Sequence, residues 1–269
     1  MSTLFSLKDD IAVVVGGTGG LGGAIAQGLA EAGARVAVCG RSESRGNERV
    51  KAITDAGATA KFYPTNALSA ESLEASAQAV TEDFGTPTIL VNSAGGNDPK
   101  VTVTDQLKFK ELNLEDWRAA FDLNVVGGFL LPCQVFGPAM LKAGRGSIIN
   151  IASVSSHIPL SRVVAYSASK AAVLSLTMWL SREWAPMGVR VNSITPGFFP
   201  ANQNRRLLYH EDGTPTPRTQ AILSHTPMKR FGNPDELIGA AVYLASDRAS
   251  GFVTGTDLRV DGGFLSQTI

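Results

Sequence analysis

A short apolar run followed by a glycine-rich turn constrains the fold of this chain more than any other feature of its sequence. Residues 11–15 are all apolar and mostly β-branched, and six glycines occur among the next eight residues, 16–23. Residues 24–32 then favour a helix, with Gly33 where that helix would end. A strand, a glycine turn and a helix in this order place backbone N–H groups and a positive helix end where a pyrophosphate can bind. The sequence therefore predicts a dinucleotide site here, and a flexible turn without a ligand is the alternative.

The same alternation of strand-like and helical patterns continues along the whole chain. We expect further strands at 34–39, 58–63, 88–92, 147–152, 189–194 and 257–260. We expect helices starting near Ser44 and at about 69–84, 115–142, 163–185 and 234–246. Strands that alternate with helices form a parallel sheet covered on both faces. The sequence therefore predicts an α/β fold with a doubly wound, parallel seven-stranded sheet in three αβα layers (Rossmann fold).

Length and composition agree with one domain. No Pro/Ser/Gly-rich linker or run of charge divides the chain, so we expect residues 1–269 to form a single domain. The 24 basic and 24 acidic side chains give a net charge of zero, which argues against broad binding of nucleic acid or anionic membranes. No apolar stretch approaches the ~20 residues that span a bilayer, and the start lacks a signal-peptide pattern. We expect a cytoplasmic protein with a small-molecule substrate.

The cysteines and histidines show no pattern of metal ligation. Cys39 and Cys133 lack CxxC spacing, so we interpret both as reduced packing residues. His157, His210 and His225 are scattered through polar segments, and we interpret them as surface or substrate-loop residues. We therefore predict no metal site.

The end of the second predicted strand bears on the choice of cofactor. In dinucleotide folds an acidic residue at this place binds the ribose 2′-hydroxyl, whereas an arginine accommodates a 2′-phosphate. Here the strand ends in Gly40, Arg41 and Ser42, without an acid. Gly40 leaves room, and Arg41 with Ser42 offers donors and positive charge. We therefore favour NADP(H) over NAD(H) as the cofactor, and a solvated loop arginine is the alternative.

A tyrosine and a lysine four residues apart suggest a proton-transfer site. Residues at this spacing share one face of a helix, so the ammonium of Lys170 can come near the phenol of Tyr166. A nearby positive charge lowers the pKa of a tyrosine towards the range useful to a general acid or base. Ser153, thirteen residues upstream, adds a hydroxyl to the set. For the tyrosine and lysine taken alone, the alternative is a solvated helix face.

Together these segments resemble the short-chain dehydrogenase/reductase family over nearly the full length of the chain. The resemblance rests on motifs that occur in the family's order and spacing. They are Gly16, Gly20 and Gly22 in the glycine loop, Asn92-Ser93-Ala94-Gly95, the helix residue Asn124, the set Ser153, Tyr166 and Lys170, Pro196-Gly197, and Val260-Asp261-Gly262-Gly263. The family implies an NAD(P)-dependent enzyme that interconverts a secondary alcohol and a ketone.

The resemblance also implies roles for individual residues. Tyr166 would be the general acid/base, Ser153 would hold the carbonyl oxygen, and Lys170 would bind the nicotinamide ribose and lower the pKa of Tyr166. Asn124 would anchor a water that links Lys170 to solvent, and a core amide is its alternative role. The cofactor would be bound by Gly16, Thr18, Gly19, Gly20, Leu21, Gly22, Arg41, Ser42, Asn66, Ala67, Asn92, Ala94, Gly95, Tyr166, Lys170, Pro196, Gly197 and Phe199.

Two positions depart from the family pattern. Val15 replaces the threonine before the first loop glycine, so we expect packing to replace a hydroxyl bond to the strand of Asn92. Asn66 replaces an aspartate after the third strand, and its amide carbonyl can still accept a hydrogen bond from an adenine amino group. Neither change argues strongly against cofactor binding.

Two long segments outside the sheet, residues 96–114 and 197–228, carry the substrate prediction. Both would leave the carboxyl ends of strands, where ligands bind in open α/β sheets. Their amides suit hydroxyl groups and their paired arginines suit a carboxylate, while a solvated helix end is the alternative. The predicted substrate-binding residues are Asn97, Ser155, Gln203, Arg205 and Arg206.

Within the family these loops are similar to those of bacterial D-mannonate/D-fructuronate oxidoreductases, especially at residues 95–100 and 196–199. This similarity implies oxidation of a sugar acid, of the mannonate/fructuronate or gluconate type, or reduction of its keto form. The alternatives are a 3-oxoacyl-thioester (acyl carrier protein) reductase and, in another class, a non-catalytic nucleotide-binding regulator. The family also implies a homotetramer in which the 115–142 and 163–185 helices pair between subunits.

Overall fold

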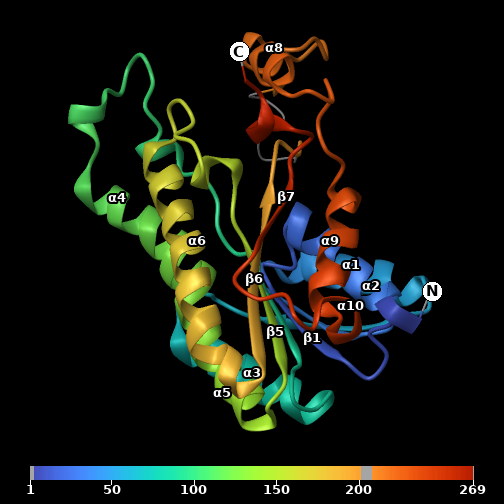
Figure 1. Ribbon diagram of the computed structural model, residues 1–269. Helices are drawn as coiled ribbons and strands as arrows, with labels where there is room; N and C mark the ends of the chain where they lie inside the picture. Colours follow the sequence, from blue (N-terminus) through green and yellow to red (C-terminus); the bar gives the residue numbers. More distant parts are fainter. Residues whose placement is uncertain (1–2, 201–207, 269) are drawn as a thin grey trace.

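A computed structural model describes residues 3–200 and 208–268, and its centre is a twisted sheet of seven parallel strands (Figure 1). Their order across the sheet is β3-β2-β1-β4-β5-β6-β7. The chain moves outward from β1 in one direction and from β4 in the other, and ligands bind at such a reversal in open α/β sheets. All seven predicted strands are confirmed to within two residues. They are β1 (Ile11–Val15), β2 (Arg35–Gly40), β3 (Thr59–Pro64), β4 (Ile89–Asn92), β5 (Gly146–Ile151), β6 (Val189–Pro196) and β7 (Asp257–Val260).

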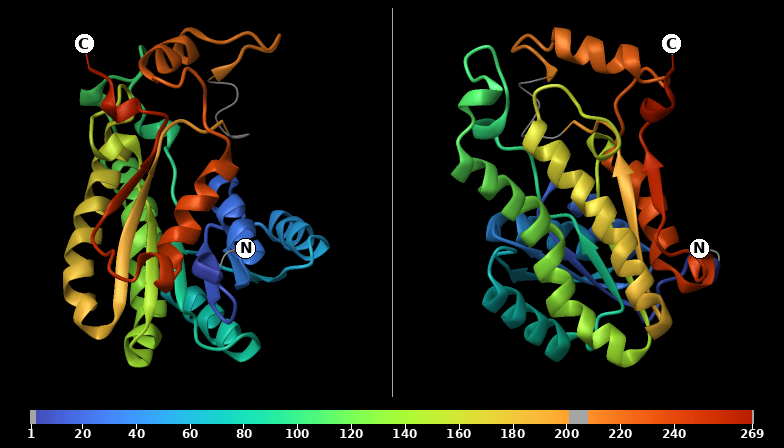
Figure 2. Two further views of the ribbon diagram at one scale, coloured as in Figure 1. Left: turned by 45° about the vertical axis from the view of Figure 1, so that its right-hand side comes forward. Right: turned by 60° about the vertical axis from the view of Figure 1, so that its left-hand side comes forward.

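Helices cover both faces of this sheet (Figures 1 and 2). One face carries α1 (Gly20–Glu31), α2 (Glu43–Asp55), α9 (Ile238–Ala245) and α10 (Asp247–Ser250), and the other carries α3 (Ala70–Asp83), α4 (Leu114–Phe121), α5 (Leu131–Ala143) and α6 (Val164–Trp184). A further helix, α8 (Pro217–His225), lies beyond the carboxyl ends of the strands (Figure 1). The predicted three-layer fold is therefore confirmed.

Strand β1 shows how one segment serves two cores. Ala12 and Val14 pack into the cluster that includes α1 and α9, whereas Val13 and Val15 pack into the cluster of α3, α5 and α6. All four side chains are buried, which is why the run is apolar throughout instead of alternating. Full burial of a valine contributes on the order of 1.5–3 kcal/mol by removing it from water.

The helix predicted at 115–142 is continuous but not uniform. Helix α4 passes into a π-helical segment, Asp122–Leu130, which passes into α5. The π-helical segment contains Gly128, where a Cβ would lie 2.7 Å from the carbonyl oxygen of Ala94. Glycine therefore allows this widened part of the helix to lie directly against the segment that follows β4. π-helical turns inside α-helices commonly occur at functional sites.

The same segment corrects the expectation that no apolar stretch is long enough to cross a membrane. Residues Leu114–Ala143 are helical over 30 residues and meet the requirement for a membrane span by length and composition. The core helix of a globular fold has the same composition. Phe129, Phe136 and Met140 are buried in the core between this helix and the sheet, which accounts for much of its apolar character.

The glycine turn contributes more to α1 than predicted. The helix begins at Gly20, four residues earlier than expected, and Gly19 is its extended N-cap (φ −84°, ψ 171°). Gly33 follows the helix with a φ of +109°, as expected for a helix end. The helix predicted at 234–246 begins instead as a 3₁₀ turn, Pro234–Leu237, before α9. The starts of these two helices were therefore predicted less accurately than the strands, whereas α3 and α6 match the predicted 69–84 and 163–185 to within one residue.

Two helical glycines with unequal surroundings test the packing of α1 on α9. A Cβ on Gly28 in α1 would overlap the side chain of Ile238, whereas a Cβ on Gly239 in α9 would meet no atom within 4 Å. We predict that Gly28→Ala lowers the free energy of unfolding by about 1–3 kcal/mol through overpacking. Gly239→Ala should raise it by up to about 1 kcal/mol, because alanine loses less backbone entropy in a helix. Urea denaturation measures both changes, and effects of the same sign would contradict this packing.

Candidate active site

The turn between β1 and α1 requires glycine at two places. Gly16 has a φ of +88°, and a Cβ there would lie 2.6 Å from the amide nitrogen of Ala94. A Cβ on Gly22 would lie 2.5 Å from the carbonyl oxygen of Gly16. The contact at Gly16 holds the turn against the segment that follows β4, and the contact at Gly22 closes the turn on the start of α1. Two parts of the predicted cofactor site, distant in the sequence, are therefore in contact.

The first turn of α1 presents backbone donors without a side-chain cap. Its N-cap, Gly19, makes no side-chain hydrogen bond, and Gly20 is exposed. The leading N–H groups of a helix have no partner within it and carry the positive end of the helix dipole. With no side chain at Gly19 or Gly20, the turn forms a cradle that a pyrophosphate fits. Thr18 and Leu21, also predicted to bind cofactor, lie in the same turn.

Arg41 and Ser42 follow β2, next to β1 in the sheet. Gly40 packs on Thr18, since a Cβ would lie 2.7 Å from Thr18 Oγ1. Arg41 is exposed, and no described carboxylate is paired with it. Ser42 Oγ lies 3.3 Å from Ser44 Oγ. Positions 40–42 therefore offer one cation and one hydroxyl, and no acid, to a cofactor ribose, and Glu43 is the first residue of α2.

Asn92 connects β4 to its neighbours through a buried polar network. Its Nδ2 donates to Asn150 Oδ1 at 2.8 Å and approaches Cys133 Sγ at 3.4 Å. Asn150 Nδ2 in turn donates to Thr177 Oγ1 at 2.9 Å. Asn92 Oδ1 is buried and has no hydrogen-bond partner among the described residues. The network ties β4, β5 and α6 together beneath the predicted cofactor segment.

Asn124 clamps the segment after β4. Its Oδ1 accepts a hydrogen bond from Gly96 N at 2.9 Å, and its Nδ2 donates to Gly96 O at 3.0 Å and Ala120 O at 2.9 Å. Gly95 has a φ of +145°, and a Cβ there would lie 2.6 Å from Asn124 Oδ1. This fully buried amide therefore positions backbone, as a core amide would. Its role in anchoring a water stays a prediction.

Ser153, Tyr166 and Lys170 meet at the carboxyl end of β5. The side chains of Tyr166 and Ser153 are hydrogen-bonded to each other, and Ser153 Oγ accepts from Ser155 N at 3.2 Å. Lys170 Nζ donates to the carbonyl oxygen of Ile151 at 2.7 Å and lies 5.9 Å from the centre of the Tyr166 ring. The fold thus brings together a phenol, a hydroxyl and an ammonium from two chain segments. Such a group can exchange a proton with a bound oxygen atom.

Burial dominates the electrostatics of this group. It raises the pKa of Tyr166 above its ordinary value, and the hydrogen bond with Ser153 opposes this effect. Burial also lowers the pKa of Lys170 to about 8. The expectation that Lys170 lowers the pKa of Tyr166 is therefore not met in this structure. The ammonium is bonded to the Ile151 carbonyl, and the desolvation of the phenol outweighs the other effects on it.

The two departures from the family pattern have local partners. Val15 is buried in the apolar core on the face of α3, α5 and α6, so packing takes the place of a hydroxyl bond. Asn66 is exposed, and its Oδ1 already accepts a hydrogen bond from Leu68 N at 3.2 Å. Ala67 lies against the π-helical segment, where a Cβ on Gly127 would lie 3.1 Å from its carbonyl oxygen. The adenine contact of Asn66 stays a prediction.

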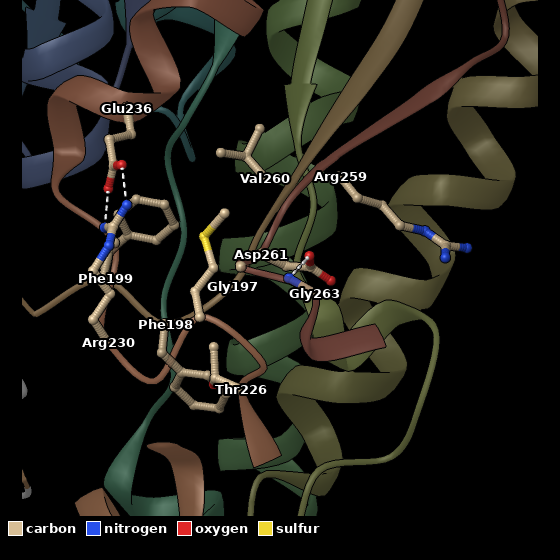
Figure 3. Close-up of a pocket in the computed structure, with 13 residues that line it drawn as sticks. Gly197, Phe198, Phe199, Thr226, Arg230, Glu236, Arg259, Val260, Asp261 and Gly263 are labelled. Atoms are coloured by element: carbon tan, nitrogen blue, oxygen red, sulfur yellow. Dashed lines mark hydrogen bonds and ion pairs between the residues drawn. The ribbon is translucent and has the colours of Figure 1, made fainter. Parts of the chain in front are cut away.

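A cavity of about 400 Å³ lies at the carboxyl ends of β6 and β7 (Figure 3). It is lined by Gly197 and Phe199 after β6, by residues 260–263, and by Arg230, which is paired with Glu236 at 2.6 Å. The cavity borders the predicted cofactor segment after Pro196, but none of Ser153, Tyr166 and Lys170 lines it. The Phe199 side chain belongs to the core and packs over Gly232, which leaves mainly backbone to face a cofactor.

Only two of the predicted substrate residues can be described. Asn97 is exposed and donates to Thr102 Oγ1 at 2.8 Å. Ser155 is buried, and its hydroxyl has no hydrogen-bond partner in the part of the chain that the structure describes. Gln203, Arg205 and Arg206 lie outside the described residues.

The structure gives His157 a contact that the sequence did not predict. Its Nε2 lies 3.0 Å from Asp257 Oδ2 and 3.3 Å from Thr195 Oγ1, so this partly buried ring ties the loop after β5 to β6 and β7. No local pattern could reveal a partner 100 residues away. His225 packs on Phe264 with ring centres 4.6 Å apart, and His210 is exposed.

The cysteines are packing residues, as predicted. Cys39 and Cys133 are free and buried on the face of the sheet that carries α3, α5 and α6. Burial raises the pKa of each thiol to about 12, which keeps it protonated and unreactive at neutral pH. Among the described residues, no cluster of three or more His, Cys, Asp or Glu side chains could hold a metal.

Known proteins resemble this chain over nearly its whole length. A family model described as enoyl-(acyl carrier protein) reductase matches residues 16–265. The uncharacterized oxidoreductase UxuB of Bacillus subtilis is 41% identical over 97% of this chain and 96% of its own length. D-threitol dehydrogenase of Mycolicibacterium smegmatis is 39% identical over 97% of this chain and 94% of its own length.

Solved structures also match nearly the whole length of this chain. A Haemophilus influenza protein assigned as a D-mannonate oxidoreductase, with bound NAD, has a TM-score of 0.92 at 38% identity and covers 98% of this chain and 97% of its own. A gluconate 5-dehydrogenase from Burkholderia cenocepacia, in complex with NADP and tartrate, has a TM-score of 0.87 at 32% identity and covers 98% of each chain. The matched structures therefore include nicotinamide complexes of this fold.

Lys170 allows a test of this site through the pH dependence of stability. Its pKa falls from an ordinary value of 10.5 to about 8 in the folded protein. Between pH 8 and pH 10.5, residue 170 binds more protons in the unfolded chain than in the folded protein. The contribution of Lys170 to stability therefore rises with pH in this window. We predict that the free energy of unfolding of the wild type, minus that of Lys170→Met, increases by about 3 kcal/mol across this window.

Chemical denaturation of both proteins across the same pH window measures that difference. Subtracting the variant removes the contributions of tyrosines and cysteines, which also titrate at alkaline pH. A difference that does not change with pH would contradict a buried, titrating Lys170.

Proposed function

This chain belongs to the short-chain dehydrogenase/reductase family, and on that premise we propose that its substrate is a sugar acid. The protein is an NAD(P)-dependent oxidoreductase that interconverts a secondary alcohol and a ketone. The proposed reaction is oxidation of a hydroxyl group of an aldonate such as mannonate or gluconate. In the reverse direction, a keto acid such as fructuronate is reduced.

The proposed chemistry divides between the cofactor and three side chains. Bound NADPH or NADH supplies the hydride. Tyr166 gives its proton to the carbonyl oxygen during reduction and takes it back from the alcohol during oxidation. Ser153 donates a hydrogen bond to the same oxygen, and this bond strengthens as negative charge develops there. Lys170 holds the nicotinamide ribose, and its positive charge opposes the desolvation that raises the Tyr166 pKa.

One observation carries this proposal: Tyr166 is hydrogen-bonded to Ser153 beside the buried ammonium of Lys170. Removing an ammonium from water is costly, so a purely structural helix would gain nothing from a lysine there. The raised pKa of Tyr166 keeps the phenol protonated at neutral pH. A protonated phenol is ready to act as the acid that reduction requires, and oxidation needs its pKa to fall once the cofactor is bound.

Two relatives support a sugar acid over other alcohols. The matched structures include a protein assigned as a D-mannonate oxidoreductase and a gluconate 5-dehydrogenase. The name of the matching family model points to an acyl carrier protein instead, so a 3-oxoacyl-thioester reductase is the nearest alternative. The amide-rich sequence of residues 202–204 suits hydroxyl groups better than an acyl chain. A non-catalytic regulator would not need the converging group of Ser153, Tyr166 and Lys170.

We favour NADP(H) as the cofactor because positions 40–42, at the end of β2, offer Arg41 and Ser42 and lack an acid. The two matched structures contain NAD in one case and NADP in the other, so they support a nicotinamide cofactor of either kind. The preference for NADP(H) rests on the residues at positions 40–42 alone.

We further propose that residues 1–269 form a single cytoplasmic domain that assembles as a homotetramer. The helices expected to pair between subunits carry exposed apolar side chains: Leu114 of α4 is 59% exposed, and Met178 and Trp179 of α6 are 58% and 57% exposed. Exposed apolar side chains on two helices of the same face of the sheet would mark a protein interface if they form one patch in the assembly. The segments 96–114 and 197–228 would then form the substrate loops of each subunit.

Tyr166→Phe tests the proposed general acid. The variant keeps the ring and loses only the hydroxyl, so it should bind reduced cofactor as the wild type does, as measured by fluorescence titration. We predict that its turnover falls on the order of 10²-fold or more, the usual scale for loss of a general acid. Turnover close to that of the wild type would reject the mechanism.

A panel of carbonyl compounds tests the substrate class. The absorbance of NADPH and, in parallel, of NADH is followed with fructuronate, 5-ketogluconate and an acetoacetyl thioester. We predict consumption of reduced cofactor with a keto acid, and faster reaction with NADPH. Activity with the thioester alone would eliminate the sugar-acid proposal, and a clear preference for NADH would remove the role assigned to Arg41.

A further inference from the structure

Two arginines from separate segments come together at the carboxyl end of the sheet. Arg162 ends the loop that begins at Ser153 and leads into α6, and Arg218 lies in the first turn of α8. Figures 1 and 2 show α8 at the same end of the molecule as this loop. The positive charge of Arg162 acts on Arg218, so the two guanidinium groups lie within electrostatic reach of each other.

The backbone of Arg162 is held in an unusual conformation. Its φ is +74°, a left-handed value that a residue with a long side chain rarely adopts. Its carbonyl oxygen accepts a hydrogen bond from Val103 N at 2.8 Å, which ties it to the 96–114 segment. Such conformations persist only where the surroundings enforce them, and they concentrate at functional sites. Arg162 is therefore fixed at a position four residues before Tyr166.

Helix α8 is anchored at both ends, so Arg218 is also held in place. At its start, Thr216 is the N-cap, and the hydroxyl of the fully buried Thr219 donates to the carbonyl oxygen of Leu208. At its end, His225 packs on Phe264, which itself packs on Phe198 after β6 with ring centres 5.1 Å apart. The helix is therefore docked on the carboxyl ends of β6 and β7. Arg218, in its first turn, is partly buried.

Neither arginine has an anionic partner in the part of the chain that the structure describes. The undescribed segment 201–207 contains no aspartate or glutamate. Burial, and then the charge of Arg162, lower the pKa of Arg218. Two cations within electrostatic reach of each other, one of them partly buried, repel each other, and a bound anion would relieve this repulsion. The pair therefore has the charge and the donors to bind an anion from solution.

We propose that Arg162 and Arg218 bind the carboxylate of the sugar acid while its reacting hydroxyl lies at Ser153 and Tyr166. This inference rests on the proposed function. The loop that carries Ser153 also carries Arg162, so one loop holds both the reacting oxygen and one half of the carboxylate site. The pair assigns to described residues the task that the sequence suggested for Arg205 and Arg206.

The position of the pair argues against a role in holding the cofactor's phosphates. The features that fit those phosphates, the first turn of α1 and Arg41, follow β1 and β2. Arg162 and Arg218 follow β5 and β6, on the other side of the point where the sheet reverses its order. An anion bound by the arginine pair therefore belongs to the substrate. A neutral polyol would leave the two charges uncompensated.

The experiment compares an acid with its uncharged isostere. Oxidation of D-gluconate, D-mannonate and the corresponding aldonamides is measured for the wild type, Arg162→Gln and Arg218→Gln at saturating NADP⁺. We expect each variant to lose roughly 10- to 100-fold in kcat/KM with the aldonate, mainly through KM, as for a lost hydrogen bond to a charged group. The values for the aldonamide should stay close to those of the wild type.

Two further variants act as controls. Arg218→Lys keeps the charge but loses the planar fork, so it should retain part of the activity with the acid. Arg248→Gln removes an exposed arginine from α10, away from α8 (Figure 1), and should leave both substrates unaffected. Equal losses with aldonate and aldonamide would show a distorted loop instead of a carboxylate site and would overturn the inference. Unchanged activity with the aldonate in either glutamine variant would also overturn it.

A binding measurement separates this inference from the proposed function. Thermal denaturation of the wild type and both glutamine variants is followed with D-gluconate in the presence of NADP⁺. Stabilisation of the wild type that is lost in both variants supports the anion site, even if the wild type oxidises no sugar acid and the proposed function fails. Stabilisation that is equal in all three proteins, or absent from the wild type, rejects the site while leaving the alcohol–ketone chemistry intact.

Discussion

The hydrogen bond between the buried ammonium of Lys170 and the carbonyl oxygen of Ile151 is the interaction on which the site depends most. An ammonium removed from water must be bonded, and here the bond fixes α6 against the carboxyl end of β5. Tyr166 lies one turn earlier on the same helix, so the bond also sets the height of the phenol above the sheet. The pKa of Lys170, lowered to about 8, expresses the cost of this burial.

The remaining parts of the site are held together by glycines and one amide. Gly16 and Gly22 allow the β1 turn to lie against the segment after β4, and Asn124 binds that segment by both backbone groups of Gly96. Asn124 can reach it because the helix widens into a π-helical segment that approaches Ala94 at Gly128. The glycine turn after β1, the segment after β4 and the Tyr166 group are thus connected by direct contacts. A substitution that displaces one of them should therefore displace the others.

Local sequence patterns predicted the strands, the sheet type and the meeting of Tyr166 with Lys170, because periodicity and a four-residue spacing on a helix are local properties. Features that arise from contacts between distant segments were missed. His157 meets Asp257 across 100 residues, and Arg162 comes within electrostatic reach of Arg218 from a distant segment, α8, which packs on Phe264. The predicted lowering of the Tyr166 pKa was also wrong. Burial raises this pKa, and the burial of a side chain cannot be inferred from residue spacing.

Transfer of a deuterium label shows directly whether hydride and the Tyr166 proton reach one carbonyl group. The protein is mixed with NADPH deuterated at both C4 positions and with the keto acid that it reduces fastest, and the product is analysed by mass spectrometry. We expect one deuterium on the carbon that bears the new hydroxyl, and much slower labelling in Tyr166→Phe. An unlabelled product, or equal rates of labelling in the two proteins, would contradict this expectation.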